Sequence, residues 1–318
     1  MPDGPTVSVP LAGGAEFDRI RAIMHALGSR AEGLGSDVRY IPGGDGQIAL
    51  SIDVSVEGVH FRRDWLSPEE IGWRATASAL SDLAAGGAAC IGALVALTTP
   101  AREPEATFVA LMRGVDAALE SAGGVVLGGD LSRGDAMAVA VTVVGRGTGA
   151  ISRRGARAGD GLWVTGELGG SRAALAAWID GRTPDPAARE RFARPVPRLT
   201  EGRWLADHGA TAMIDLSDGL GADAGHLAAA SGLALHLELR EVPVHPAARV
   251  AAEAGSQRPA IFAAWGGEDY ELLAAMPPGF TGTTEFELTR IGEFAPGNGV
   301  TFTLDGRPVQ PGGYDHFA

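Results

Sequence analysis

The sequence contains no lysine, because all 26 basic residues of the 318-residue chain are arginines. This absence excludes Schiff-base chemistry and the phosphate-binding lysine of a P-loop, since both need a lysine amine. If the protein handles phosphates, other groups must hold them. The 39 carboxylates give a formal net charge of −13, so we expect neither a nucleic-acid partner nor an anionic-membrane surface. Phosphate chemistry in so acidic a chain would point to metal ions.

Cysteine and long hydrophobic runs are also scarce. The one cysteine, Cys90, lies in the apolar run 88–91, so we expect no internal disulfide and a packing role for its side chain. The longest weakly apolar stretch, 83–97, contains three glycines and is too short to cross a bilayer. Residues 1–14 carry no basic segment before an apolar core, the pattern of a secretory signal. We therefore predict a cytoplasmic protein.

Helical and extended patterns alternate along the chain, which indicates an α/β or α+β fold of about two domains. In the first half we expect helices at 16–27, 68–85 and 103–122 and strands at 47–56, 91–97 and 136–144. In the second half we expect helices at 170–178, 197–208 and 220–230 and strands at 162–165, 212–214, 234–238 and 271–275. The glycine- and arginine-rich segment 145–161 lacks an apolar period, so we predict domains at 1–148 and 149–318.

Several aspartates lie where a purely structural role explains them poorly. Asp82 lies in a predicted helix among small apolar residues, and a buried carboxylate costs several kcal/mol unless it is paired or binds a cation. Asp53 ends an apolar strand, and Asp130 follows a strand in the predicted turn 128–130. Strand ends beside glycines are where ligand sites form in open sheets. The alternative for each aspartate is an ordinary solvent-facing, capping or turn residue.

The densest acidic motif is Ile-Asp-Leu-Ser-Asp-Gly-Leu at 214–220, followed by Asp223. Asp215 and Asp218 lie three residues apart where a strand gives way to a helix, so their carboxylates and the Ser217 hydroxyl could converge there. A helix N-cap would explain Ser217 or Asp218 but not Asp215. Oxygen ligands of this kind suit Mg²⁺, and the scattered histidines and single cysteine disfavour zinc. We therefore predict a metal and phosphate site.

Six ordered motifs resemble the thiamine-monophosphate kinase family and extend over nearly the whole chain. They are Asp53 with VEGVHF at 56–61, LSDLAA at 80–85, GGD at 128–130, DLSDGL at 215–220, GGEDYEL at 266–272 and GYDHF at 313–317. The resemblance implies transfer of the γ-phosphoryl group of ATP to thiamine monophosphate, giving thiamine diphosphate and ADP. It also implies the fold of the aminoimidazole ribonucleotide synthetase superfamily, with two α/β domains, ATP bound without a P-loop, and a homodimer formed by the N-terminal sheets.

The same resemblance assigns roles to individual residues. It implies that several Mg²⁺ ions are held by Asp37, Ser51, Asp53, Asp82, Asp130, Asp215 and Asp218. ATP would contact Gly129, Asp130, Arg153 and Ser217, and thiamine monophosphate would contact His60, Glu268 and Tyr314. We assign no catalytic base, because the acceptor phosphate oxygen is already anionic. Asp130 and Asp218 would act through Mg²⁺, and positioning and charge neutralisation would drive an in-line transfer.

Two positions depart from the family pattern, and both concern one magnesium site. Ser36 stands where the first of two paired aspartates is usual, and Ile52 stands where threonine is common. The alternatives are another enzyme of the superfamily, such as a purine-pathway or selenophosphate synthetase, and a regulatory nucleotide-binding protein without turnover. No reactive cysteine precedes Asp37, which disfavours the selenophosphate enzyme, and the retained aspartates disfavour loss of turnover.

Overall fold

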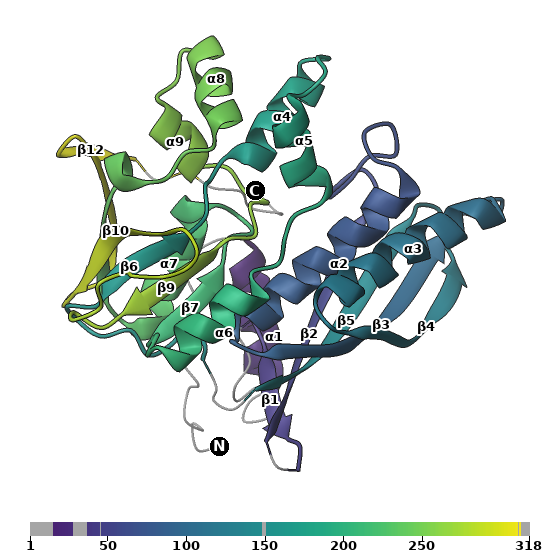
Figure 1. Ribbon diagram of the computed structural model, residues 1–318, viewed down its shortest axis with the longest axis horizontal. Helices are drawn as coiled ribbons and strands as arrows, with labels where there is room; N and C mark the ends of the chain where they lie inside the picture. Colours follow the sequence, from purple (N-terminus) through teal and green to yellow (C-terminus); the bar gives the residue numbers. More distant parts are fainter. Residues whose placement is uncertain (1–14, 28–36, 45, 148–150, 311, 313–318) are drawn as a thin grey trace.

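The computed structural model describes residues 15–27, 37–44, 46–147, 151–310 and 312. They form two β-sheets side by side, with helices packed on and between them (Figure 1). The mixed α/β class expected from the sequence is confirmed. No helix within these ranges is long and apolar enough to cross a membrane.

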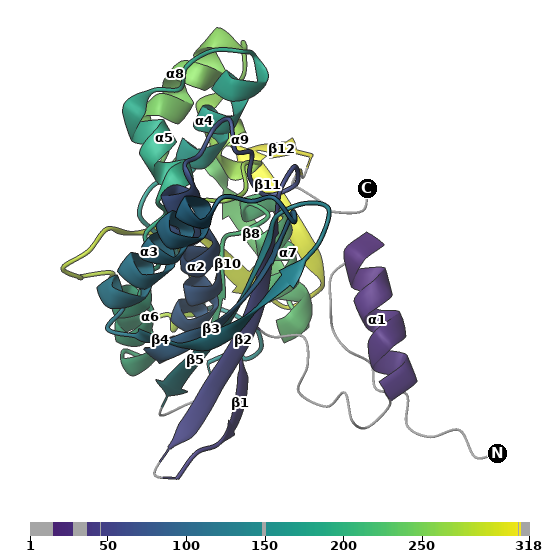
Figure 2. The same cartoon turned by 90° about the vertical axis from the view of Figure 1, so that its right-hand side faces the viewer.

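The five-stranded sheet has the order β1-β2-β5-β3-β4. Its strands are β1 (Arg39–Pro42), β2 (Gln47–Val56), β3 (Ala89–Thr99), β4 (Val125–Arg133) and β5 (Ala138–Gly147). Helix α1 (Ala15–Leu27) precedes them, and α2 (Pro68–Ala85) and α3 (Glu105–Ser121) cover one face of the sheet (Figure 2). Alternating valines of β5, at 139, 141 and 143, are fully buried, which is the period-two pattern of a half-buried strand.

Helix α2 is built to lie close to its neighbours. It begins with a capping box, in which the Ser67 hydroxyl accepts from the backbone of Glu70 and the Glu70 carboxylate accepts from Ser67 N. A Cβ atom at Gly72 would lie 2.0 Å from the Leu111 carbonyl oxygen of α3. Glycine at the crossing therefore allows the two helix backbones to approach each other more closely than any side chain would permit.

The seven-stranded sheet has the order β12-β11-β8-β10-β6-β9-β7. Its strands are β6 (Gly161–Thr165), β7 (Ala212–Asp215), β8 (Ala234–Glu238), β9 (Leu272–Met276), β10 (Leu288–Ala295), β11 (Gly299–Leu304) and β12 (Arg307–Val309). The helices of this half are α4 (Gly170–Ile179), α5 (Pro186–Ala193), α6 (Leu199–Asp207), α7 (Leu220–Ser231), η2 (Leu239–Glu241), α8 (Pro246–Ala254) and α9 (Pro259–Ala264). Strand β7, at one edge of this sheet, and its neighbour β9 are buried along their whole length.

Helix α2 also joins the two halves. A Cβ atom at Gly202 of α6 would lie 2.1 Å from the Ala84 carbonyl oxygen of α2, so these helices also touch through their backbones. Ion pairs link Arg189 of α5 to Glu70 and Arg194 just after α5 to Glu69. Buried apolar side chains of both sheets also belong to one continuous hydrophobic core. The predicted division at 148/149 falls between β5 and β6, and it stays a prediction because the halves share this core.

Most predicted elements are present, but two local interpretations were wrong. Asp53 does not end a strand, because β2 continues through it to Val56. The segment 128–130 is not a turn, because β4 continues through it and pairs in parallel with β3. A Cβ atom at Gly129 would lie 1.9 Å from the Val95 carbonyl oxygen, so this glycine allows close strand pairing. Gly128, at φ +152°, accompanies the register shift between Ala93 and Leu94. Glycines that suggest a turn in the sequence thus lie within an irregular strand.

Candidate active site

Three aspartates from distant parts of the chain meet between the two sheets. Asp37 precedes β1, Asp82 lies on α2 and Asp215 ends β7. Each offers a carboxylate oxygen, and these oxygens all lie within 4.8 Å of one another. Asp37 and Asp215 are buried, and the Ser51 hydroxyl of β2 donates a 2.5 Å hydrogen bond to Asp82 Oδ2. The structure therefore brings together four of the predicted metal ligands.

The electrostatics of this carboxylate cluster favour a bound cation. Burial, together with repulsion from Asp37, raises the pKa of Asp215 to about 7. Burial and the neighbouring charges of Asp215, Asp37 and Asp53 raise the pKa of Asp82 well above its usual value. Carboxylates crowded in this way hold protons or bind a cation, because burying their charges unpaired is costly. The all-oxygen donor set, with the Ser51 hydroxyl, fits Mg²⁺.

Arg153 is the positive charge of the cluster. Its guanidinium donates from Nη2 to Asp37 Oδ1 at 2.6 Å and from Nε to both oxygens at 3.1 and 3.2 Å. Burial alone would lower the pKa of Arg153, but Asp37, Asp215 and Asp223 raise it above its ordinary value. The predicted ATP-contacting arginine therefore lies in the site, where it pairs with a predicted metal ligand.

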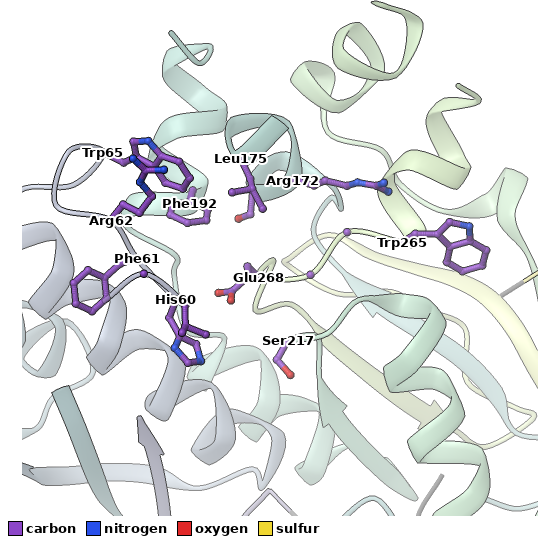
Figure 3. A pocket seen from close by; sticks show the side chains of 15 residues that line it. His60, Phe61, Arg62, Trp65, Arg172, Leu175, Phe192, Ser217, Trp265 and Glu268 are labelled. Atoms are coloured by element: carbon purple, nitrogen blue, oxygen red, sulfur yellow. The ribbon is translucent and has the colours of Figure 1, made fainter. Parts of the chain in front are cut away.

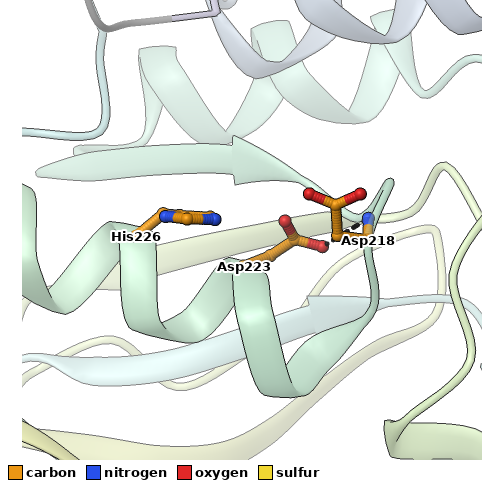
Figure 4. Close-up of side chains that lie close together, drawn as sticks. All are labelled: Asp218, Asp223 and His226. Atoms are coloured by element: carbon orange, nitrogen blue, oxygen red, sulfur yellow. Dashed lines mark hydrogen bonds between the residues drawn. The ribbon is translucent and has the colours of Figure 1, made fainter. Parts of the chain in front are cut away.

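The loop after β7 forms a second acidic group (Figure 4). Asp223 Oδ2 accepts hydrogen bonds from the backbone N–H groups of Asp218 at 3.1 Å and Gly219 at 2.9 Å. Ligand atoms of Asp218, Asp223 and His226 lie within 4.8 Å of one another. Burial lowers the pKa of His226 to about 4, so this imidazole is neutral at pH 7. The sequence prediction missed His226, although its spacing of three from Asp223 places both on one face of α7.

The helix-cap alternative for this loop was wrong. The N-cap of α7 is Gly219, at φ +105°, and no side chain caps the helix. Ser217 and Asp218 therefore lie outside α7 and are not used as its caps. Helix α7 begins at Leu220, two residues after Asp218, so its N-terminus adjoins the acidic loop, and a helix N-terminus favours a bound anion.

A pocket of about 310 Å³ opens beside this loop (Figure 3). It lies between residues 58–65 of the first half and α4, α5 and the loop 265–268 of the second. Its lining comprises Gly58, Val59, His60, Phe61, Arg62, Trp65, Ser171, Arg172, Leu175, Phe192, Ser217, Trp265, Gly266, Gly267 and Glu268. The walls are largely aromatic and aliphatic, and the charged side chains among them are Arg62, Arg172 and the carboxylate of Glu268. Such a pocket suits a flat ring with a polar or cationic edge.

The pocket contains two of the predicted substrate residues. His60 lines the pocket. The His60 Nδ1 atom accepts a 3.1 Å hydrogen bond from Val56 N, which fixes the orientation of the imidazole ring. Glu268 reaches the pocket from the loop before β9, and its backbone N–H donates to the Ser217 carbonyl oxygen at 2.8 Å. This bond joins the pocket directly to the acidic loop. Tyr314, the third predicted substrate residue, and Ser36 lie outside the described residues.

Glycines allow the two loops to meet. A Cβ atom at Gly267 would lie 2.5 Å from the Ser217 carbonyl oxygen, and one at Gly219 would lie 2.7 Å from the Gly266 carbonyl oxygen. Backbone-to-backbone contact therefore sets the distance between Ser217 and Glu268.

Gly129 and Asp130 are not part of either cluster. Both lie on the edge strand β4 and are exposed, and Asp130 Oδ2 accepts a hydrogen bond from the Ser132 hydroxyl at 3.1 Å. Strand β4 is three positions from β2 in the sheet, which places it roughly 14 Å from the strand that carries Ser51 and Asp53. Within one chain, these two predicted residues therefore do not reach the carboxylate cluster.

Known proteins are similar to this chain in sequence and in fold. Residues 35–147 match the family model for the AIR synthase related protein, N-terminal domain. The chain is 34% identical over 307 residues to the thiamine-monophosphate kinase of Aquifex aeolicus, covering 95% of this chain and 98% of that protein. It is 34% identical over 322 residues to the enzyme of Salmonella typhimurium, covering 95% and 96%.

Solved structures are similar as well. The structure described as "AaThiL complexed with AMPPCP and TMP" superposes with a TM-score of 0.88 at 33% identity, covering 96% of this chain and 97% of that one. Structures of the hydrogenase maturation protein HypE share the fold, with TM-scores up to 0.75 at 16–19% identity. The fold and the acidic site thus define an AIR synthase-related protein. Within that class, the chain belongs to the thiamine-monophosphate kinase family.

Proposed function

We propose that this protein transfers the γ-phosphoryl group of ATP to thiamine monophosphate, giving thiamine diphosphate and ADP. The observation that carries the proposal is the direct bond between the two parts of the site. The Glu268 N–H bond to Ser217 joins a pocket for a flat, cationic ring to an acidic loop suited to phosphates and Mg²⁺. The two named relatives are thiamine-monophosphate kinases that match this chain over almost their full length, and they support the same reaction.

The metal would be held by residues of the carboxylate cluster. Asp37, Asp82 and Asp215 offer oxygens within 4.8 Å, and Ser51 and Asp53 lie on the adjoining strand. These residues would hold Mg²⁺, which would supply positive charge to offset the negative charge that develops during transfer. The Asp218 carboxylate would help to hold such an ion at the acidic loop.

The chain's own groups would do the positioning. The N-terminus of α7 and Arg153 would bind the ATP phosphates, since helix N–H groups and guanidinium both favour anions. Glu268 and His60 would orient the acceptor in the pocket, with its phosphate directed past Ser217 toward ATP. Because that phosphate oxygen is already anionic, no side chain has to remove a proton, and the rate would come from alignment and charge neutralisation.

A homodimer would complete the site. The face of the five-stranded sheet opposite α2 and α3 exposes large apolar side chains, namely Ile52, Val54, Leu94, Val125 and Leu127. An exposed apolar patch of this kind marks an interaction surface, and β4 is an edge strand that pairs on one side only within the described residues. In a two-fold dimer of these sheets, Gly129 and Asp130 of the partner subunit would approach the carboxylate cluster that they cannot reach within one chain. We also propose a cytoplasmic location, where ATP is available.

One assay tests the proposed reaction. The purified protein is incubated with ATP, Mg²⁺ and thiamine monophosphate, and thiamine diphosphate and ADP are separated and quantified. Thiamine and aminoimidazole-pathway precursors replace thiamine monophosphate as controls. We expect equal amounts of both products with thiamine monophosphate and none with the controls. ADP formation with an aminoimidazole-pathway precursor, and not with thiamine monophosphate, would instead identify a purine-pathway enzyme.

The catalytic site is tested with matched variants. Asp215→Asn removes a carboxylate of the cluster, and we expect kcat to fall by about 100-fold or more, as when a group that stabilises transition-state charge is lost. Asp180→Asn changes an exposed aspartate that pairs with Arg182, and we expect its activity to equal that of the wild type.

A further inference from the structure

We propose that Arg74 and Tyr270 are positioning residues for Glu268, fixing one oxygen of its carboxylate so that the other faces the ring of the acceptor. The proposal rests on the proposed function and deepens it. It assigns selectivity for an amino-substituted or cationic heteroaromatic ring to a three-residue network that spans both halves of the chain.

The hydrogen bonds of the network converge on a single atom. Arg74 Nη2 donates to Glu268 Oε2, and the Tyr270 hydroxyl donates to the same oxygen at 2.6 Å. Within the described ranges, the hydrogen bonds found for this carboxylate both end on Oε2. The Glu268 side chain is 29% exposed and lines the pocket. Oε1 is therefore the atom presented to a ligand, in one fixed orientation.

The donors themselves are held rigidly. The Arg74 side chain is 4% exposed, and its Nη1 donates a second hydrogen bond to the Phe192 carbonyl oxygen. Its Cζ atom lies 3.8 Å from the centroid of the Phe192 ring. Phe192 is itself a wall of the pocket. Burial raises the pKa of Tyr270 well above its ordinary value, and the Glu268 charge adds to this shift, so the phenol remains a donor. Charge-assisted bonds in such a desolvated place are strong and directional.

The backbone is strained at two residues of this network. Glu268 and Tyr270 have φ values of +70° and +51°, which are unfavourable for residues with a side chain. The backbone N–H of Glu268 donates to the Ser217 carbonyl oxygen, and the backbone N–H of Tyr270 donates to the Leu216 carbonyl oxygen at 2.9 Å. Strain that persists under such constraints is typical of a functional site, because only the surrounding contacts maintain it.

The residues on either side anchor the loop without entering the pocket. Asp269 Oδ2 accepts from Gly169 N at 2.7 Å, and Glu271 accepts from Arg191, Arg198 and Thr165 at 2.6–2.7 Å. Residues 269 and 271 therefore fasten the loop to the second half, while residues 268 and 270 build the network. Because Arg74 belongs to α2, the carboxylate is oriented only when the two halves are packed together.

The experiment compares two conservative variants with two matched controls. Tyr270→Phe removes one donor of the network, and Arg74→Lys keeps the charge but loses the second donor of the guanidinium fork. Tyr40→Phe removes another partly buried tyrosine hydroxyl, which donates to the Gly86 carbonyl oxygen at 2.6 Å. Arg189→Lys alters another arginine that bridges to α2, through Glu70. Steady-state kinetics and calorimetric titration with thiamine monophosphate are measured for each.

We expect Tyr270→Phe to raise KM and Kd for thiamine monophosphate about 3- to 10-fold, and Arg74→Lys by about 10-fold or more, as for lost hydrogen bonds to a charged group. The KM for ATP should stay within about twofold in both, and the two controls should match the wild type. In a cycle with Glu268→Gln, the Tyr270→Phe effect should shrink, because the residue acts through the carboxylate.

Two results would overturn the proposal. One is an unchanged KM for thiamine monophosphate in both variants. The other is an equal loss for ATP and thiamine monophosphate, which would indicate a general structural role. The proposed function is judged separately, on the wild-type protein. If the wild type makes thiamine diphosphate and both variants bind thiamine monophosphate normally, the proposed function stands and the network is refuted. Should Arg74→Lys fail to fold by circular dichroism, Tyr270→Phe carries the test, since it removes a single oxygen atom.

Discussion

Arg153 and Asp37 form a bidentate ion pair at the centre of the carboxylate cluster, with the shortest contact, Nη2 to Oδ1, at 2.6 Å. One of these residues was predicted to bind ATP and the other Mg²⁺. Their pairing means that each neutralises the other when neither ligand is present. Binding of the nucleotide and its metal would then exchange this internal pair for two external partners, so both ligands would bind more tightly together than separately.

The first prediction concerns stability without metal. Arg153→Ala leaves Asp37, Asp82 and Asp215 without their cation, and we expect the metal-free protein to lose about 3 kcal/mol of unfolding free energy, as when one partner of a buried pair is removed. Mg²⁺ should restore part of the loss by taking the place of the guanidinium. Urea unfolding with chelator and with Mg²⁺ measures both values. The same loss in the two conditions would show that Arg153 does not offset the carboxylate charges.

The second prediction concerns pH. Burial raises the pKa values of both Asp215 and Asp269 to about 7, whereas an unfolded aspartate titrates near 4. Between these values the folded protein binds more protons than the unfolded chain, so stability falls as pH rises. We expect the melting temperature in chelator to drop by several °C from pH 5.5 to 8, at about 2 °C per kcal/mol.

Two changes separate the contributions of Asp215 and Asp269 to the pH dependence of the melting temperature. Saturating Mg²⁺ should reduce the part due to Asp215, because the ion stabilises the ionised carboxylate. Asp269→Asn should remove the other part, since its carboxyl lies at the start of α4 and outside the metal cluster. A melting temperature that rises between pH 5.5 and 8 in chelator would contradict the sign of both pKa shifts.

The acidic residues were predictable from the sequence, but their grouping was not. Asp82 and Asp215 stand out because carboxylates among small apolar residues need a partner. The partner of Glu268 could not be found in this way, since Arg74 lies 194 residues away and a lone arginine on a helix carries no signal. His226 was missed because it lies in an alanine-rich helix without a motif.

The glycines show the same division between pattern and geometry. Gly128 and Gly129 look like turn residues locally, but strand pairing with β3 decides their conformation. Sequence patterns thus predicted which residues are unusual, whereas contacts between distant segments determine what each one does. Asp130 lies on a strand at the sheet edge, so its place in the active site depends on the dimer that we propose.

The third prediction uses two glycines of the α7 region. Gly219→Ala places a Cβ atom 2.7 Å from the Gly266 carbonyl oxygen at φ +105°, and we expect loss of at least about 1–2 kcal/mol of stability and most of the activity, since strain and overlap act together. Gly225→Ala, in the helix with no atom within 4 Å, should instead add about 0.5–1 kcal/mol. Denaturation and kinetics on both variants check the contrast, and equal effects would refute the role of loop contact.

The fourth prediction concerns the exposed sheet face. Val125 on β4 is 57% exposed and lies on that face, so replacing it by glutamate costs little in an isolated chain but disrupts an apolar interface. We expect Val125→Glu to convert a dimer into a monomer with little catalytic activity. Ile179→Glu, at a still more exposed position on α4, serves as the control and should remain dimeric. Sedimentation velocity distinguishes the species, and a dimeric Val125→Glu protein would place the interface elsewhere.

The fifth prediction tests whether each site draws on both subunits. Asp82→Asn and Asp130→Asn should each inactivate the homodimer, because every site then lacks one carboxylate. If Asp130 reaches the cluster of the partner subunit, a mixed dimer contains one site with both substitutions and one with neither. Since random exchange makes half of the dimers mixed, an equal mixture should recover about a quarter of the wild-type activity. The mixture is unfolded and refolded together, and its thiamine diphosphate formation is compared with that of each variant alone. If Asp130 instead serves its own chain, every site in the mixed dimer keeps one substitution and the mixture stays inactive.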